Sequence, residues 1–415
     1  MSADPRRSTI RGMSSFSDPM AASRWRVLTV ATWQQAALTF VRFGIPALAP
    51  FLRADFGLSL GEVGAVIGAF NLGALLVFYP TGRGTERLGE RLVMSAGAAA
   101  VAFACALLVL SSSWWLLALG LALAGTGFPS SQIAGSRAVY RAFGPRGRGL
   151  AMGVRQAGLP LGGLLAALVL PGIATHWGWR GAMLAGAAVA LSGGIFCVLL
   201  PPPTRGEKPT APGMARDVAA FLRRRDLLGI TGMATLLVVG QFSLMSYLPL
   251  YLVDDFGMSK SAAALSLIGL QVGGVAGRLA WGWVSDRFAG GRRTGTLIII
   301  CLTGGLCAAA LTTASLAAVF CLAVAGGATL QGWNGLYVTL LAERAGDAAA
   351  TMLSLSMMSL YVAAMFAPPA FGALIETLGY RPAWVLLVVP QVLAALLVWS
   401  VRRAAGHSTR IGNAD

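Results

Sequence analysis

Three arginines lie inside long apolar runs of the sequence, namely Arg42, Arg155 and Arg278. The runs are long enough to cross a bilayer, and a cation near the bilayer centre costs at least about 2.5–3.5 kcal/mol. No Asp or Glu lies deep in any of these runs, so each arginine needs an external counter-charge, backbone partners or water. Because the planar guanidinium donates paired hydrogen bonds to oxyanions, the pattern predicts a cavity that receives an anion.

Each of these arginines also has a structural interpretation. Arg155 and Arg278 could extend their apolar stems until the charge reaches the cytoplasmic interface. Arg42 could donate to backbone carbonyls near Pro46. The sequence leaves both interpretations open beside that of substrate contact.

The segment GVRQAGLPLGG at 153–163 surrounds one of the three arginines. Its small residues allow helices to approach closely, and Pro160 frees backbone groups within the membrane, so the segment is typical of a packing seam or a hinge. Arg155 and Gln156 are the residues of this segment that would face a substrate.

Further polar side chains lie in the middle of the apolar runs: Trp33, Gln34, Asn71, Tyr247, Gln271, Trp333 and Asn334. As a set they predict the lining of one pathway, whereas any single one could form an interhelical hydrogen bond worth about 0.6 kcal/mol. The members that we expect to contact the substrate are Trp33, Asn71, Tyr247, Gln271 and Asn334.

The elements that must position these residues follow from the composition. Of the 415 residues, 56% are hydrophobic and 12% are charged, and the mean hydropathy is +0.71. A soluble domain carries about twice that share of charge, so the chain is predicted to be an all-α membrane protein. The net charge of +16 would suit nucleic acid, but the arginines lie in short loops without a basic face, which argues against such a partner.

Apolar runs of about 20 residues predict twelve transmembrane helices, six on each side of a Pro-rich, charged connection. We expect a disordered tail at 1–22, a six-helix bundle at 23–200, a linker at 201–226, a second bundle at 227–401 and a tail at 402–415. Most Lys and Arg residues fall in the tails and in alternate loops, which predicts that both termini and the linker are cytoplasmic.

An internal repeat relates the two bundles. ADFGLS at 54–59 matches DDFGMS at 254–259, and the same offset places Asn71 opposite Gln271. It also relates GRGTER at 82–87 to GWVSDR at 282–287. The two copies predict two pseudo-symmetric halves.

Twelve helices in two similar halves, with G-x-x-x-D-R after the second helix of the second half and G-x-x-x-E-R in the first, resemble the major facilitator superfamily. The resemblance covers essentially the whole chain. It implies a secondary transporter in which the halves rock about a midplane site, so that the site opens to each side in turn. The first copy departs from the family pattern in Glu86 and Glu90, and the arginine of the family's fourth helix is missing.

The motif residues are expected to act as conformational latches at the cytoplasmic ends of the helices. A carboxylate there can pair with arginine and with the positive end of a neighbouring helix, and so favour one of two states. Plain anchoring by positive charge is the alternative. The expected latch residues are Gly82, Glu86, Arg87 and Arg91 in the first copy and Gly282, Asp286, Arg287 and Arg292 in the second.

The stretch R-x-x-x-G that begins at Arg278 resembles the oxalate–formate and monocarboxylate branches of that family. The resemblance implies that this arginine meets the substrate carboxylate. Proton-coupled monocarboxylate carriers have an aspartate one turn earlier, where this chain has Gly274, so proton coupling through that aspartate is not expected.

We therefore expect a transporter in a bacterial inner membrane that moves a small organic anion, and no enzyme, cofactor or metal site. Of the two histidines, we expect His176 on the outer side of the membrane and His407 in the tail, and the sequence has no glycine-rich phosphate-binding loop with lysine. Efflux of apolar or cationic compounds is the alternative function, and a sensor or a channel is a further one. The expected partners are the substrate, a coupling ion left open here and the lipid bilayer, with the chain as a monomer.

Overall fold

The computed structural model describes residues 19–143, 145–201, 214–287 and 293–411. The described residues are helical apart from short turns and contain no strand. Residues 1–18, 202–213 and 412–415 of the expected tails and linker lie outside them, as does Arg292. Helix α1 begins at Pro19, inside the expected first tail, and α8 occupies Met214–Leu222 inside the expected linker. The domain boundaries stay predictions.

The helices divide into those before the linker and those after it. The first group is α1 (Pro19–Phe56), α2 (Leu60–Leu88), α3 (Glu90–Leu107), α4 (Trp114–Gly127), α5 (Pro129–Ala142), α6 (Pro145–Gln156) and α7 (Gly158–Phe196). The second group is α9 (Arg225–Asp254), α10 (Lys260–Ala264), α11 (Ser266–Arg287), α12 (Arg293–Ala310), α13 (Leu316–Leu330), α14 (Asn334–Ala345), α15 (Ala349–Leu378), α16 (Tyr380–Leu386) and α17 (Val388–Ile411).

Eleven segments in the described part of the chain are long and apolar enough to cross a membrane. The segment Ala151–Leu199 has 49 residues, about twice the length that a bilayer needs. Within it Gly178 has φ 67° and ψ 173°, which is not helical. The expected count of twelve divides this segment in two and stays a prediction.

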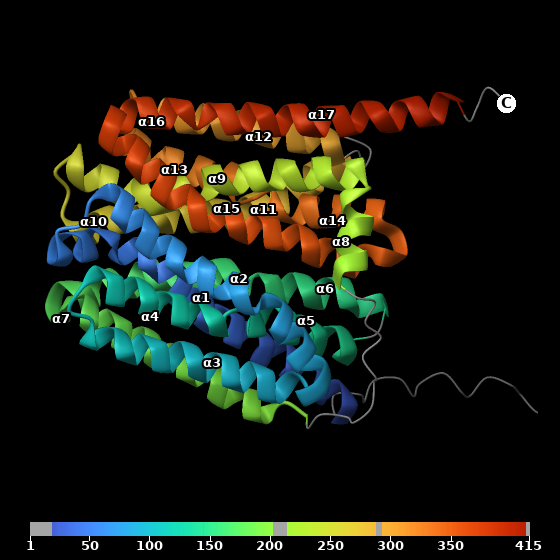
Figure 1. Cartoon of the computed structure of the whole chain (residues 1–415), viewed down its shortest axis with the longest axis horizontal. Helices are drawn as coiled ribbons and strands as arrows, with labels where there is room; N and C mark the ends of the chain where they lie inside the picture. Colours follow the sequence, from blue (N-terminus) through green and yellow to red (C-terminus); the bar gives the residue numbers. More distant parts are fainter. Residues whose placement is uncertain (1–18, 144, 202–213, 288–292, 412–415) are drawn as a thin grey trace, which may run out of the picture.

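The two groups form two bundles that lie one above the other in Figure 1. In the first bundle α1 packs along α7 and α2 along α4, and in the second α11 packs along α13 and α12 along α17. We call these bundles the first and second half. The described chain begins and finishes at the same end of the molecule (Figure 1), which we call the inner end. Its placement in the cytoplasm stays a prediction.

The opposite end, which we call the outer end, shows the repeat in its turns. Gly57 and Gly257 have φ of 61° and 64°, and Gly178 and Gly379 have φ of 67° and 83°. Glycine enters this left-handed region without a steric penalty, so each pair supplies the same turn in both halves.

The helices that follow two of these turns also begin alike. Ser59 accepts from the backbone N–H of Glu62 at the start of α2, and Ser259 accepts from that of Ala262 at the start of α10. A serine at this position satisfies an unpaired N–H of the first helical turn.

Glycines also set the same helix crossing in both halves. A Cβ on Gly73 of α2 would lie 1.7 Å from the carbonyl oxygen of Ala122 in α4. A Cβ on Gly273 of α11 would lie 1.9 Å from that of Val324 in α13. Only glycine lets these backbones approach so closely, so the packing repeats as the sequence does.

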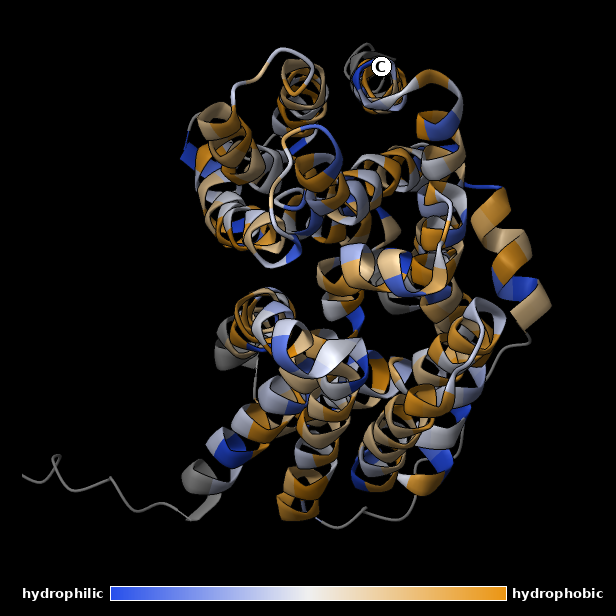
Figure 2. Cartoon of the chain, turned by 90° about the vertical axis from the view of Figure 1, so that its left-hand side faces the viewer, coloured by the Kyte–Doolittle hydropathy of each residue, from blue (hydrophilic) through white to orange (hydrophobic). Residues whose placement is uncertain are grey.

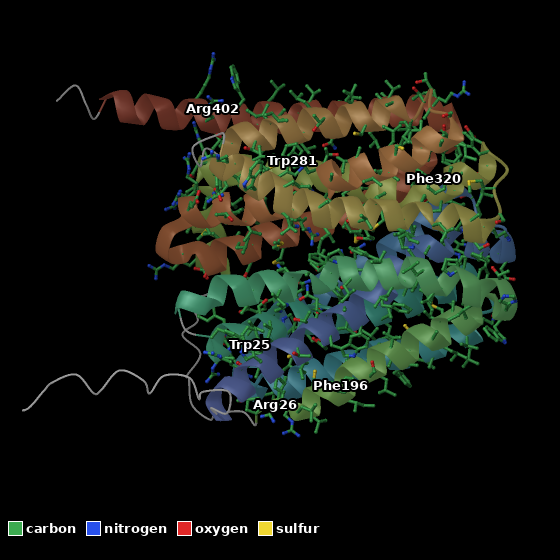
Figure 3. The ribbon with its side chains drawn as sticks, turned by 180° about the vertical axis from the view of Figure 1, so that it is seen from behind. Trp25, Arg26, Phe196, Trp281, Phe320 and Arg402 are labelled. Atoms are coloured by element: carbon green, nitrogen blue, oxygen red, sulfur yellow. The ribbon has the colours of Figure 1, made fainter. Side chains whose placement is uncertain are left out.

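Large apolar side chains cover the outward faces of the bundles. Leu119 is 68% exposed and Leu306 is 69% exposed, and Figure 2 shows the hydrophobic colour on the outside of many helices. Monomeric soluble proteins rarely expose contiguous apolar patches of this kind, so these faces suit lipid. Arg26 and Arg402, labelled in Figure 3, lie toward the inner end.

Candidate substrate site and gates

One of the three predicted arginines, Arg42 of α1, lies at the junction of the halves. Its Nη2 donates to Oδ1 of Asn71 in α2 at 2.7 Å. Aromatic rings surround the guanidinium carbon Cζ, with centroids at 4.7 Å (Phe128), 5.1 Å (Tyr361), 5.3 Å (Phe242) and 5.6 Å (Phe43). We call these four rings the aromatic cage.

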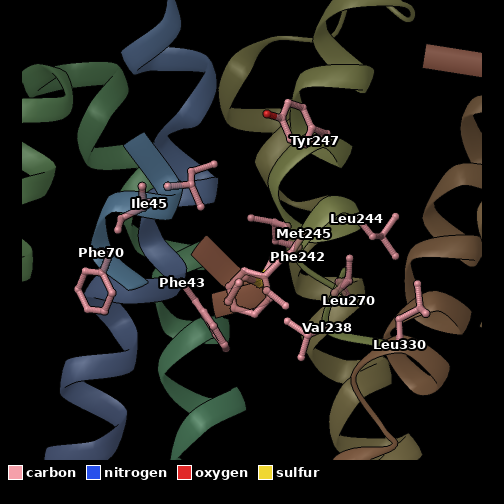
Figure 4. Packing of buried hydrophobic residues seen from close by; sticks show 14 of the residues in the cluster. Phe43, Ile45, Phe70, Val238, Phe242, Leu244, Met245, Tyr247, Leu270 and Leu330 are labelled. Atoms are coloured by element: carbon pink, nitrogen blue, oxygen red, sulfur yellow. The ribbon is translucent and has the colours of Figure 1, made fainter. Parts of the chain in front are cut away.

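The aromatic cage draws equally on both halves. Phe43 and Phe128 belong to α1 and to the break between α4 and α5, whereas Phe242 and Tyr361 belong to α9 and α15. Arg42 and Phe242 occupy equivalent positions of the sequence repeat. Figure 4 shows Phe43 and Phe242 in the region between α1 and α9. The cation therefore lies where the halves meet.

Arg42 has no carboxylate partner in the described part of the chain. Its side chain is half-buried, and its Nε is buried without a hydrogen-bond partner. A ring quadrupole attracts the guanidinium but does not neutralise it. An anion that reaches this position would therefore meet an uncompensated positive charge.

Gln271 of α11 lies beside the aromatic cage. A Cβ built on Gly163 of α7 would lie 2.8 Å from the amide carbon of Gln271 and 2.8 Å from Cδ2 of Phe43, so these groups are neighbours. Oε1 of Gln271 is buried without a hydrogen-bond partner. Of the predicted substrate contacts, Arg42, Asn71 and Gln271 lie in this region.

Arg155 lies fully buried inside the first half. It donates to the carbonyl oxygens of Ser131 and of Gln132 in α5, and to Oε1 of Gln156. Gln156 also accepts from Gln35 at 3.1 Å. These contacts bury the guanidinium inside the half and do not extend it to the interface, as the structural interpretation had expected. Substrate contact by Arg155 and Gln156 stays a prediction.

Arg278 binds within the second half. It is half-buried in α11, and its Nε donates to the carbonyl oxygen of Gln331 at 3.4 Å, in the break between α13 and α14. Asn334 is half-buried at the start of α14. The predicted substrate contact of both residues is not tested by this geometry.

Two further predicted contacts have partners elsewhere. Nε1 of Trp33 donates to Oγ of Ser192 in α7 at 3.2 Å. The hydroxyl of Tyr247 lies 2.7 Å from the carbonyl oxygens of Leu60 and Pro368, at the outer end. The structure thus separates Trp33 and Tyr247 from the aromatic cage.

At the inner end, charged residues of the motif loops pair within their own half. Asp286 lies 3.7 Å from Arg293, which also pairs with Glu343 at 2.8 Å. In the first half Glu90 pairs with Arg137 at 3.2 Å and with Arg141 at 3.3 Å. The two halves therefore form equivalent ion pairs with the charges exchanged. In the first half the acid comes earlier in the chain than its arginine partners, and in the second half Arg293 comes before Glu343.

The other expected latch residues in the described part of the chain are exposed or half-buried. Glu86, Arg87 and Arg287 are exposed, and Arg91 is half-buried. A Cβ on Gly82 or Gly282 would meet nothing within 4 Å. The latch role of this set stays a prediction.

A set of contacts that the sequence analysis missed joins the halves at the outer end. Arg53 of α1 pairs with Asp254 of α9 at 2.5 Å, and the Tyr380 hydroxyl donates to the same carboxylate at 2.8 Å. The backbone N–H of Gly61 in α2 donates to Glu376 of α15 at 2.8 Å. We call these contacts the outer seal. The sequence feature that could have revealed the outer seal is Asp254, because the equivalent position of the first half holds Ala54 and the acid is therefore specific to the second half.

A second carboxylate follows directly. Burial raises the pKa of the Asp255 carboxyl above its usual value, and the charge of Asp254 adds to this, while Arg381 opposes it. Asp255 therefore adds a second acid directly beside the Asp254 of the outer seal.

Comparison with known proteins identifies the family of this chain. The model described as Major Facilitator Superfamily matches residues 34–360. An uncharacterized MFS-type transporter of Mycobacterium tuberculosis is 29% identical, over 91% of this chain and 85% of that protein. The hexuronate transporter of Escherichia coli K12 is 23% identical, over 91% and 94%. The gallate transporter of Pseudomonas putida is 26% identical, over 94% and 93%.

A solved structure has the same fold. It is a bacterial homolog of the human lysosomal transporter Spinster in an inward-facing and unoccupied conformation. The TM-score is 0.79 with 18% sequence identity, and the match covers 93% of this chain and 98% of that one.

Proposed function

Because this chain belongs to the Major Facilitator Superfamily, whose model matches well over half of it, we propose that it carries a small organic anion of the carboxylate type. The family consists of membrane transporters and not of enzymes. We place this transporter in a bacterial inner membrane, where the halves would expose one central site to each side in turn.

The observation that carries the proposal is Arg42, a cation at the junction of the halves without a carboxylate partner in the described residues. A charge-assisted hydrogen bond from guanidinium to carboxylate is about twice as strong as a neutral one. Two of the relatives, the hexuronate transporter and the gallate transporter, are named after carboxylates. The uncompensated charge also disfavours the cationic compounds of the efflux alternative.

The proposed cycle begins from the conformation in hand. The outer seal closes the outer end, so the site would exchange its ligand at the inner end. Moving to the other state requires that Arg53 separates from Asp254 and that the inner ends approach each other. The motif residues Asp286 and Arg287 would then gain partners across the halves and stabilise the second state.

The direct test compares acids with their methyl esters, because esterification removes the charge and keeps the rest of the ligand. Binding of glucuronate and 4-hydroxybenzoate to the purified protein is measured by titration, with uptake into proteoliposomes as the second readout. We expect an acid to bind and its ester not to. Arg42→Gln should weaken binding by roughly tenfold or more, with Arg42→Lys between the two.

Arg278→Gln is measured beside Arg42→Gln, because it removes the same charge from a different helix and from the competing predicted contact. Equal binding of acid and ester, or wild-type affinity in Arg42→Gln, would remove Arg42 as the anion contact. A loss confined to Arg278→Gln would move the site to α11.

A further inference from the structure

The surroundings of Arg42 are poor in groups that could bind hydroxyls. Both ends of the Asn71 amide are already used, because Oδ1 accepts from Arg42 and Nδ2 donates to the carbonyl oxygen of Ala364 at 3.2 Å. The other groups that touch the guanidinium are the four rings of the aromatic cage, and of these only Tyr361 carries a hydroxyl, which interacts with Arg42. Oε1 of Gln271 is an acceptor in this region that is still without a partner.

These walls distinguish between two classes of organic anion. A sugar acid carries a hydroxyl on nearly every carbon, and each hydroxyl that loses water must find a partner or weaken binding. An aromatic acid presents two apolar faces, and its ring gains from offset or edge contacts with other rings. One ring hydroxyl could donate to Gln271.

Space for such a ring depends on the distance between the halves. Phe128 is fully buried, and Phe43, Phe242 and Tyr361 are each less than a tenth exposed, so the cage is closed around the guanidinium. Phe43 and Phe128 belong to one half and Phe242 and Tyr361 to the other. A separation of the halves would part the rings into two pairs and make room for a flat ligand between them.

We infer that the substrate is an aromatic carboxylate, a benzoate-type anion whose carboxylate binds Arg42 and whose ring takes a place in the aromatic cage. The inference rests on the proposed function, since it specifies the anion that the same site carries. It assigns Phe128 and Tyr361 as specificity-determining residues and Gln271 as the acceptor of a ring hydroxyl.

The experiment measures the dissociation constants of four acids with the full-length protein in nanodiscs. Benzoate is compared with cyclohexanecarboxylate, which has a similar size and charge but no aromatic face. 4-Hydroxybenzoate adds one hydroxyl to the ring, and glucuronate adds several to a saturated one. We expect benzoate to bind at least about threefold more tightly than cyclohexanecarboxylate, the scale of one ring contact, and glucuronate to bind most weakly.

Variants separate the ring contacts from the charge. Phe128→Leu should reduce the preference for benzoate over cyclohexanecarboxylate while both acids still bind. Phe103→Leu, which changes a 62% exposed ring on the outside of α3, should leave the preference unchanged. Gln271→Leu should abolish the advantage of 4-hydroxybenzoate over benzoate.

The outcomes distinguish the two proposals. Glucuronate binding as tightly as benzoate, or equal affinity for benzoate and cyclohexanecarboxylate, overturns the aromatic inference and leaves anion transport standing. Failure of all four acids to bind, in a protein that remains folded, overturns the proposed function and the inference with it. The wild-type series decides both, even where a variant does not fold.

Discussion

At the scale of single residues, the pair Arg42 and Asn71 sets the charge of the site. Asn71→Asp would keep the shape of the side chain and place a carboxylate 2.7 Å from the guanidinium. The new carboxylate would then form an ion pair with Arg42 and compete with the substrate carboxylate for the guanidinium. We expect the affinity for carboxylates to fall by roughly tenfold or more. The new ion pair raises the unfolding temperature, and the loss of the Nδ2 bond to the carbonyl oxygen of Ala364 lowers it.

The measurement is a binding titration beside a thermal unfolding scan. Gln35→Glu is the matched control, since it places a new acid beside Gln156 within the first half. If Asn71→Asp binds carboxylates as the wild type does, the substrate does not use the face of Arg42 that Asn71 covers.

The sequence identified the three arginines inside apolar helices but not the partners of each. Arg42, Arg155 and Arg278 all interrupt apolar helices, and each helix is apolar on several sides, so periodicity does not show where a side chain points. The carbonyl oxygens that bind Arg155 come from α5, more than 20 residues away in the chain. The cage around Arg42 needs α9 and α15, whose arrangement is a tertiary property.

At the scale of helices, glycines decide how closely the elements pack. Gly73→Ala would place a Cβ 1.7 Å from the carbonyl oxygen of Ala122, so α2 and α4 must move apart. Forcing atoms into a packed contact costs about 1–3 kcal/mol. We expect a lower unfolding temperature and less folded protein in the membrane.

Gly172→Ala provides the comparison, because a Cβ there meets nothing within 4 Å and the substitution only stiffens α7. Its unfolding temperature should stay at or above that of the wild type. Equal unfolding temperatures for the two variants would show that the close crossing of α2 and α4 is dispensable.

The long helices were predictable from the length of the apolar runs. Runs of about 20 apolar residues match the long helices, and the repeated sequences at 54–59 and 254–259 contain the paired turns at Gly57 and Gly257. The breaks were not predicted: α4 gives way to α5 at Pro129, and α13 stops at Leu330 before α14 starts at Asn334. Proline interrupts the backbone ladder in the first case, but whether a helix then bends or continues depends on its neighbours.

At the scale of the whole molecule, transport requires the outer seal to open. A Cβ on Gly61 would lie 3.7 Å from the backbone nitrogen of Ala373 in the other half. In a background without the five native cysteines, Gly61→Cys and Ala373→Cys can be joined by a short disulfide-exchange linker. We expect the joined protein to transport at less than about a tenth of the unjoined rate, to bind ligand still, and to recover when reduced.

A second cysteine pair controls for the chemistry. Gly84→Cys and Val93→Cys join α2 and α3 within the first half, where the corresponding contact is 3.9 Å. This link should leave transport unchanged. Transport at full rate through the linked outer end would show that the halves do not separate there.

The side-chain amide of Asn71 links the site to the second half. Its Oδ1 accepts from Arg42, and its Nδ2 donates to the carbonyl oxygen of Ala364 in α15. A ligand that draws Arg42 toward itself must turn that amide, and the bond to α15 changes with it. If a bound ligand shifts the equilibrium between the two states, thermodynamic linkage requires that the two states bind the ligand with different affinities, by the same factor. Loaded and empty carriers would then reorient at different rates, and the faster of the two decides whether the protein works as an exchanger or as a one-way carrier.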